Sequence, residues 1–159
     1  MRNTMKKILC ASALLLFLSG CNQKEEDVTV KKTTCSLEQT LNDVTFQTTQ
    51  EIEYIGETVR SQKQIVQAQF KKDDKKAKES VEASIKENEE KYKDVKGMSF
   101  EASLNKDYLY KEEITFDFKT ISATDYGKIT EQKLEGDKVT IDYQQSKNNL
   151  EKQGFTCKE

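Results

Sequence analysis

The chain has 159 residues, close to the length of one ordinary domain, so we expect a single folded unit. Charged residues make up 34% of it and hydrophobic residues 35%, and it has no proline and six glycines, which excludes proline-rich and collagen-like chains. The formal charge is −2, and lysines alternate with acidic residues, so the chain lacks the clustered basic surface that releases counterions from nucleic acid. We therefore expect no nucleic-acid partner.

The first 20 residues have the pattern of an export signal. Three basic side chains, Arg2, Lys6 and Lys7, precede the largely apolar segment 8–18. This segment is long enough for the apolar region of a secretory signal, but it is shorter than the roughly 20 residues that cross a bilayer as a helix. We therefore expect residues 1–20 to be a signal peptide, whose removal lowers the formal charge from −2 to −5.

The residues Leu18-Ser19-Gly20-Cys21 resemble the lipobox of bacterial lipoproteins, in which small residues precede a cysteine. This resemblance implies that cleavage falls between Gly20 and Cys21 and that the Cys21 sulfur carries a diacylglyceryl group. Two or more acyl chains hold a protein stably on a membrane, whereas a single chain binds only marginally. We expect a protein that is lipid-anchored to the extracytoplasmic face of a bacterial cell membrane. The alternative is an ordinary secreted protein in which a cysteine follows the signal by chance.

The segment that follows the anchor is polar. Residues 21–32 contain few apolar side chains, and a flexible stretch of this length has a root-mean-square reach of roughly 18 Å. We therefore expect residues 21–32 to be the acylated cysteine with a polar tether, and residues 33–159 to be one folded domain held just above the membrane.

Three strands are predicted at the start of this domain. Between Thr33 and Phe70 apolar and polar residues alternate with a period of two, which is typical of half-buried strands. Asn42-Asp43 and Gly56-Glu57 interrupt the alternation, and these residue types accept the backbone geometry of hairpin turns. The pattern predicts an antiparallel meander whose third strand covers 59–70.

A long helix is predicted next, over residues 74–95. Asp73 or Asp74 can cap its N-terminus, and one apolar stripe includes Val81 and Ile85. The remaining helix surface is lysine and glutamate, which indicates a solvated face rather than a site. Gly97 marks the end of the helix.

The rest of the chain predicts a second hairpin and short elements. The alternation resumes over 100–104 and 108–118, separated by Asn105-Lys106-Asp107. A helix or turn is expected at 122–129, a strand at 139–143 and a helix at 146–153. This order predicts an α+β fold, in which an antiparallel sheet of meander hairpins packs against the long helix and the short C-terminal helix.

Two cysteines remain if Cys21 is acylated and Cys10 leaves with the signal. Cys35 opens the first predicted strand, and Cys157 lies close to the end of the sequence. An even pair in an exported chain indicates a disulfide. Two free thiols are the alternative. A redox role would need close spacing such as C-x-x-C, which is missing.

The sequence gives no support for catalysis. It contains no histidine, which removes the most common general base and the Ser-His and Cys-His nucleophile pairs. Glu112 and Glu113 are adjacent on a predicted strand and therefore point to opposite faces, so we read them as solvated charges. We expect no catalytic residues, no metal site and no cofactor, and we expect the tyrosines to pack in the core.

Three segments resemble a known family. They are 92–100 (YKDVKGMSF), 114–118 (ITFDF) and the terminal stretch from Ser146 to Phe155, and together they are similar to the YehR-type small bacterial lipoproteins. The similarity covers roughly residues 33–156. It implies an α+β domain on a lipid anchor without an established biochemical function, and it carries over no catalytic group.

The expected function is therefore non-catalytic. We expect a membrane-tethered domain that binds or supports an unidentified protein or ligand of the cell envelope. The alternative is a module that binds or senses a small ligand in a pocket between sheet and helix.

Overall fold

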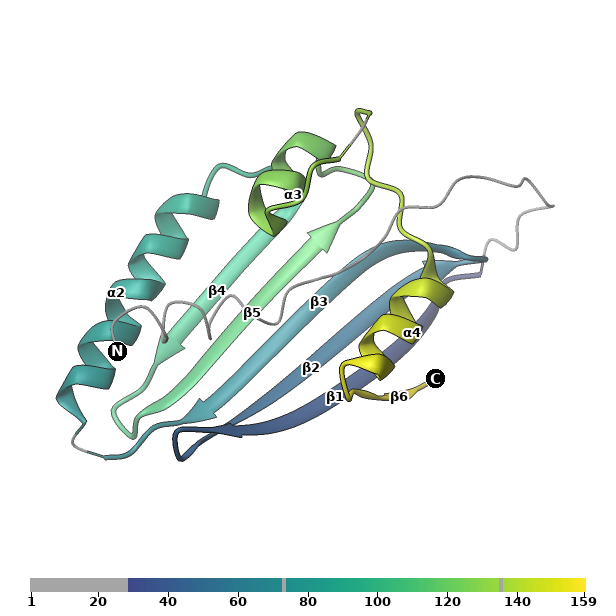
Figure 1. The fold of residues 1–159 in the computed structure, drawn as a ribbon. Helices are drawn as coiled ribbons and strands as arrows, with labels where there is room; N and C mark the ends of the chain where they lie inside the picture. The colour runs from purple at the N-terminus through teal and green to yellow at the C-terminus, as the bar shows by residue number, and fades with distance from the viewer. Residues whose placement is uncertain (1–28, 73, 135) are drawn as a thin grey trace.

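The computed structural model describes residues 29–72, 74–134 and 136–159. In this part of the chain six antiparallel strands form one sheet, and the three helices lie on the same side of it (Figure 1). The strands are β1 (Lys31–Leu41), β2 (Val44–Ile55), β3 (Thr58–Gln69), β4 (Met98–Leu104), β5 (Leu109–Asp117) and β6 (Thr156–Lys158). The helices are α2 (Lys75–Tyr92), α3 (Ala123–Thr130) and α4 (Tyr143–Lys152). The predicted α+β fold, with a long helix and a short C-terminal helix on the sheet, is confirmed.

The first three strands form the predicted meander. β1 pairs with β2 and β2 with β3, both antiparallel. Asn42 and Asp43 connect β1 to β2 with positive φ angles of 51° and 64°. Asparagine and aspartate tolerate this left-handed geometry, which fits the twist of a two-residue hairpin.

The strand order in the sheet is β4-β5-β3-β2-β1-β6. Helix α2 carries the chain from β3 to the far edge of the sheet, and the β4–β5 hairpin then returns so that β5 pairs with β3. At the other edge, β6 pairs with β1 only from Thr34 to Ser36. The two ends of the domain therefore meet at β1.

Helix α2 begins as the sequence predicts, but it ends at Tyr92, three residues before the predicted end at residue 95. The Asp74 carboxylate accepts a hydrogen bond from the Ala77 amide at 3.0 Å, which caps the N-terminus. Ala77, Val81 and Tyr92 form its buried stripe. After the helix, Gly97 adopts a φ of 79°, a conformation that favours glycine.

The substitution Gly97→Ala is expected to destabilise the fold by roughly 2 to 4 kcal/mol. The added Cβ would be strained by the positive φ and would lie 2.9 Å from Ile121 Cα, in the backbone of the loop before α3. Gly56→Ala is the matched control, because Gly56 has a φ of 58° but no atom within 4 Å of the added Cβ. Urea unfolding would measure both variants, and equal losses would contradict the close approach at Gly97.

The predicted strand at 139–143 is wrong. Val139 and Ile141 are buried, as the alternation indicated, but their segment forms only an isolated bridge, between Asp142 and Thr58, and no strand of the sheet. Its backbone bonds to the end of the β2–β3 hairpin instead: Ile141 accepts from the Val59 amide, and Tyr143 donates to the Glu57 carbonyl. Tyr143 then starts α4, which begins before the predicted residue 146.

The side of the sheet that faces the helices carries two apolar clusters. The disulfide-side cluster joins residues of β1, β2, β3 and β5 to α3, α4 and the loop before α4. The α2-side cluster joins β3 and β5 to α2. Representative members are Cys35, Ile52, Phe116, Tyr126 and Leu150 in the first and Val66, Ala68, Phe70, Val81 and Tyr110 in the second.

Candidate functional site

The predicted lipidation and cleavage residues, Gly20 and Cys21, lie outside the described residues, as do the signal segment 1–20 and most of the tether. Among the described residues, no helix is long and apolar enough to cross a membrane.

Cys35 and Cys157 form the predicted disulfide. The two residues face one another in the register of β1 and β6, and Cys35 is fully buried. The bond links positions that are 122 residues apart, so it closes nearly the whole described chain into one loop.

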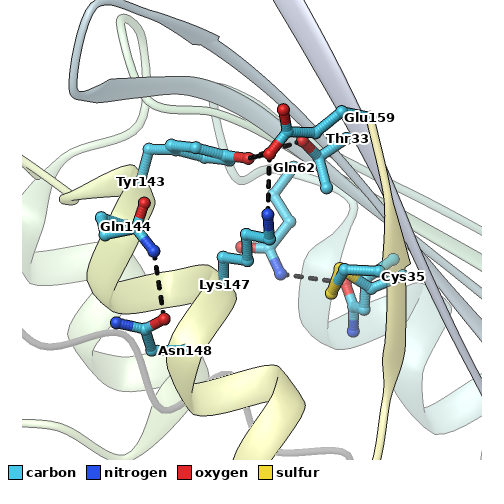
Figure 2. The surroundings of a disulfide bond; sticks show 10 residues. Thr33, Cys35, Gln62, Tyr143, Gln144, Lys147, Asn148 and Glu159 are labelled. Carbon is cyan, nitrogen blue, oxygen red and sulfur yellow. Dashed lines mark hydrogen bonds and ion pairs between the residues drawn. A yellow bond between two sulfur atoms is a disulfide. The ribbon is translucent and has the colours of Figure 1, made fainter.

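Polar contacts surround the disulfide and hold α4 against the sheet (Figure 2). The Tyr143 hydroxyl lies 2.8 Å from Thr33 Oγ1 on β1 and donates to Glu159 Oε1 at 3.2 Å. Lys147 Nζ forms an ion pair with the same Glu159 oxygen at 2.7 Å, and this bond lowers the pKa of Glu159. Burial raises the pKa of the Tyr143 phenol, whose ring stacks on Tyr54 of β2 with 3.6 Å between centroids. These contacts make α4 and β6 one structural unit with β1.

A row of buried polar side chains separates the two apolar clusters on all three central strands. On β2 it lies between Phe46 and Ile52, on β3 between Val59 and Val66, and on β5 between Tyr110 and the apolar residues that follow. We call it the polar row. Its members are Thr48, Gln50, Gln62, Gln64 and Glu112, all 9% exposed or less.

The glutamines of the polar row bond to one another. Gln62 Nε2 donates to Gln50 Oε1 at 2.9 Å, and Gln50 Nε2 donates to Gln64 Oε1. Gln62 Oε1, however, is buried and accepts no hydrogen bond. A buried acceptor without a donor costs free energy, so this oxygen is a position where a water molecule or a ligand could bond.

Glu112 is the one charged side chain of the polar row and is 1% exposed. Its Oε2 accepts a hydrogen bond from the Tyr110 hydroxyl at 2.6 Å, whereas its buried Oε1 has no partner. Burial raises the pKa of the Glu112 carboxyl, and the bond from Tyr110 offsets part of that rise. The group can therefore exchange a proton or accept a donor in an environment shielded from water.

The reading of Glu112 as a solvated charge is therefore wrong, although the predicted divergence of Glu112 and Glu113 is confirmed. Glu113 points to the other side of the sheet, where its carboxylate pairs with Lys63 at 2.6 Å. The burial of Glu112 could have been predicted from its position in the strand. It lies on the same inward-facing side as Tyr110 and Phe116. Gln62 and Gln64 likewise fall in phase with the buried Val66.

The other sequence-predicted candidates have structural roles. Asp74 caps α2, and Asp73 lies outside the described residues. Within the described ranges, no group of three or more Cys, Asp or Glu side chains could hold a metal ion. Most of the tyrosines pack in the core as predicted: Tyr54, Tyr92, Tyr110, Tyr126 and Tyr143 are buried, and Tyr108 is half-buried in the β4–β5 turn.

The architecture defines a class of small α+β domains, and two solved structures share it. A protein from Streptococcus pneumoniae TIGR4 aligns with a TM-score of 0.57 at 17% identity, over 91% of this chain and 94% of its own. The Escherichia coli YehR protein aligns with a TM-score of 0.54 at 20% identity, over 80% of this chain and 91% of its own. No family model and no curated protein sequence matches the chain. The predicted resemblance to YehR is confirmed at the level of the fold.

Proposed function

We propose that this chain is a lipid-anchored extracytoplasmic domain that binds a partner or ligand at the bacterial cell envelope without catalysing a reaction. The observation that supports export most directly is the Cys35–Cys157 disulfide. Such bonds persist in oxidising compartments outside the cytoplasm and are rare inside it. Joined to the signal pattern and lipobox that end at Cys21, the disulfide favours a domain on the outer side of the membrane.

The absence of histidine from the sequence supports the non-catalytic part of the proposal. The polar row contains one carboxyl group, whereas paired-carboxylate chemistry needs two that converge on one bond. Binding requires no such pair, so an arrangement of amides and one buried carboxyl fits recognition better than turnover.

Replacing Cys21 with alanine is expected to release the protein from the membrane or to mislocalise it. The thiol is the proposed attachment point for the acyl chains, so its loss removes membrane residence. Fractionation of cells followed by immunoblotting measures the distribution. Cys10→Ala is the matched control, because that cysteine lies inside the signal and should leave the protein on the membrane. Equal membrane association of Cys21→Ala and the unmodified sequence, with residues 1–20 removed from both, would contradict the anchor.

A second candidate function is binding of a small ligand between the sheet and the helices. The specific observation that favours it is the pair of buried oxygens without a donor, Gln62 Oε1 and Glu112 Oε1. Recognition sites hold polar groups of this kind in position before the ligand arrives. Crosslinking and affinity capture from the native membrane would distinguish a macromolecular partner from a small ligand, since reproducible recovery of one envelope protein favours the former.

A further inference from the structure

Glu112 occupies an unusual position among the charged residues that the structure describes. It alone is buried, and no ion pair involves it. Buried carboxyl groups in proteins are ordinarily paired with a cation or fully hydrogen-bonded, because desolvation of an unpaired charge is costly. Of the two carboxyl oxygens of Glu112, only Oε2 accepts a hydrogen bond, from the Tyr110 hydroxyl.

None of the described residues donates a hydrogen bond to the second carboxyl oxygen, Glu112 Oε1. Its neighbours across the sheet are Val66 on β3 and Ala102 on β4, neither of which has a polar side chain. Tyr110, a member of the adjoining α2-side cluster, already bonds to the other oxygen, Oε2. A cation supplied by a ligand could therefore bond to this oxygen.

The second acceptor lies along the same row. Val66 is the β3 residue opposite Glu112, so Gln62 lies four residues further along β3, a backbone separation of about 13 Å. Both side chains point to the helix-covered side of the sheet, and both present an oxygen without a donor. An extended ligand with donors at two points could bond to both.

We propose that Glu112 anchors a binding site for a ligand that carries a protonated amine, with Gln62 Oε1 as the second acceptor. An ammonium group would supply both a hydrogen-bond donor and the positive charge that a buried carboxylate lacks. Bonds between charged partners are roughly twice as strong as neutral ones. The formal charge of −5 expected for the chain without residues 1–20 would also attract a cation. This inference names the ligand class for the binding role proposed above and rests on that role.

The test follows the carbon-13 signal of the Glu112 carboxyl in the full acylated protein, extracted in detergent, across a pH titration. The probe is n-butylammonium chloride. The controls are sodium chloride at the same ionic strength and the uncharged 1-butanol. Saturable binding of butylammonium is expected to lower the titration midpoint of Glu112 by about one pH unit or more, which corresponds to at least tenfold preference for the ionised carboxyl. A midpoint that shifts equally with sodium chloride, or does not shift, would overturn the proposal.

Variants provide an independent readout. Glu112→Gln is expected to weaken butylammonium binding at least tenfold, whereas Glu113→Gln, which alters the opposite face of the sheet, should leave it unchanged. Equal binding by Glu112→Gln and the unmodified protein would refute the site. If Glu112→Gln does not fold, the titration of the unmodified protein still decides the question. Failure here leaves the Cys21 anchor intact, because that part of the proposed function is measured by membrane fractionation.

Discussion

Replacing Cys35 and Cys157 together with alanine is expected to lower the free energy of unfolding by about 4 to 5 kcal/mol. The disulfide joins residues 122 positions apart, and closing so long a loop removes much of the conformational freedom of the unfolded chain. The loss should be large for this domain because β6 pairs with β1 over only three residues. Guanidinium unfolding of the two proteins under oxidising conditions measures the difference.

The control for the disulfide experiment is reductant. Adding it should destabilise the unmodified protein by a similar amount and should leave the double-alanine variant unchanged. Thiol alkylation before reduction, followed by intact mass measurement, shows whether the bond was present at the start. A double variant that loses less than about 1 kcal/mol would mean that the polar contacts of Tyr143 and Glu159 hold the chain ends together without the bond.

Replacing Glu112 with glutamine is expected to stabilise the protein at neutral pH, by an amount that shrinks toward zero as the pH falls to about 4. Burial raises the pKa of Glu112 in the folded state above its ordinary value of 4.5. Between the two pKa values the unfolded chain is ionised while the folded chain keeps its proton. The unmodified protein therefore loses stability as the pH rises through this window, by at most about 1.4 kcal/mol per pH unit.

The difference between variant and unmodified protein isolates this effect, because all other titrating groups are shared. Glutamine keeps the shape of the neutral carboxyl and can still accept the bond from Tyr110. Urea unfolding at several pH values from about 4 to about 8 would measure it, with Glu113→Gln as the neighbouring control on the other face. A stability difference that stays constant over that range would show that Glu112 is not shifted by burial.

The regular parts of this fold could be predicted because their side-chain pattern and their backbone geometry agree. The meander from β1 to β3 follows from strict alternation and from turn residues such as Asn42 and Asp43. Helix α2 follows from its apolar stripe and from the capping residue Asp74. In these elements each local preference supports the same structure, which is the condition under which sequence patterns are informative.

The remaining elements depend on long-range contacts that no local pattern records. β6 has only three residues, and it forms because Cys157 bonds to Cys35 and α4 delivers the chain to the edge of β1. The segment around Ile141 has the alternation of a strand, but it forms only an isolated bridge between Asp142 and Thr58, at the start of β3. The position of β5 between β3 and β4 in the sheet is likewise set by tertiary packing and not by a local sequence pattern.

The polar row shows how composition can mislead. A glutamate on a strand is usually solvated, so Glu112 is predicted to be exposed from its residue type, although its position in the alternation places it on the inward face. The structure places Gln50, Gln62 and Glu112 inside, between two apolar clusters that would otherwise merge into one core. Sites where a local rule is broken in this way are where function is most often found.

Mass spectrometry of the N-terminal peptide of the protein purified from its native membrane tests the central proposal most directly. The account predicts a peptide that begins at Cys21 and has the added mass of a diacylglyceryl group on that residue. A peptide that begins at another residue, or one that begins at Cys21 without any lipid, would contradict the proposed anchor.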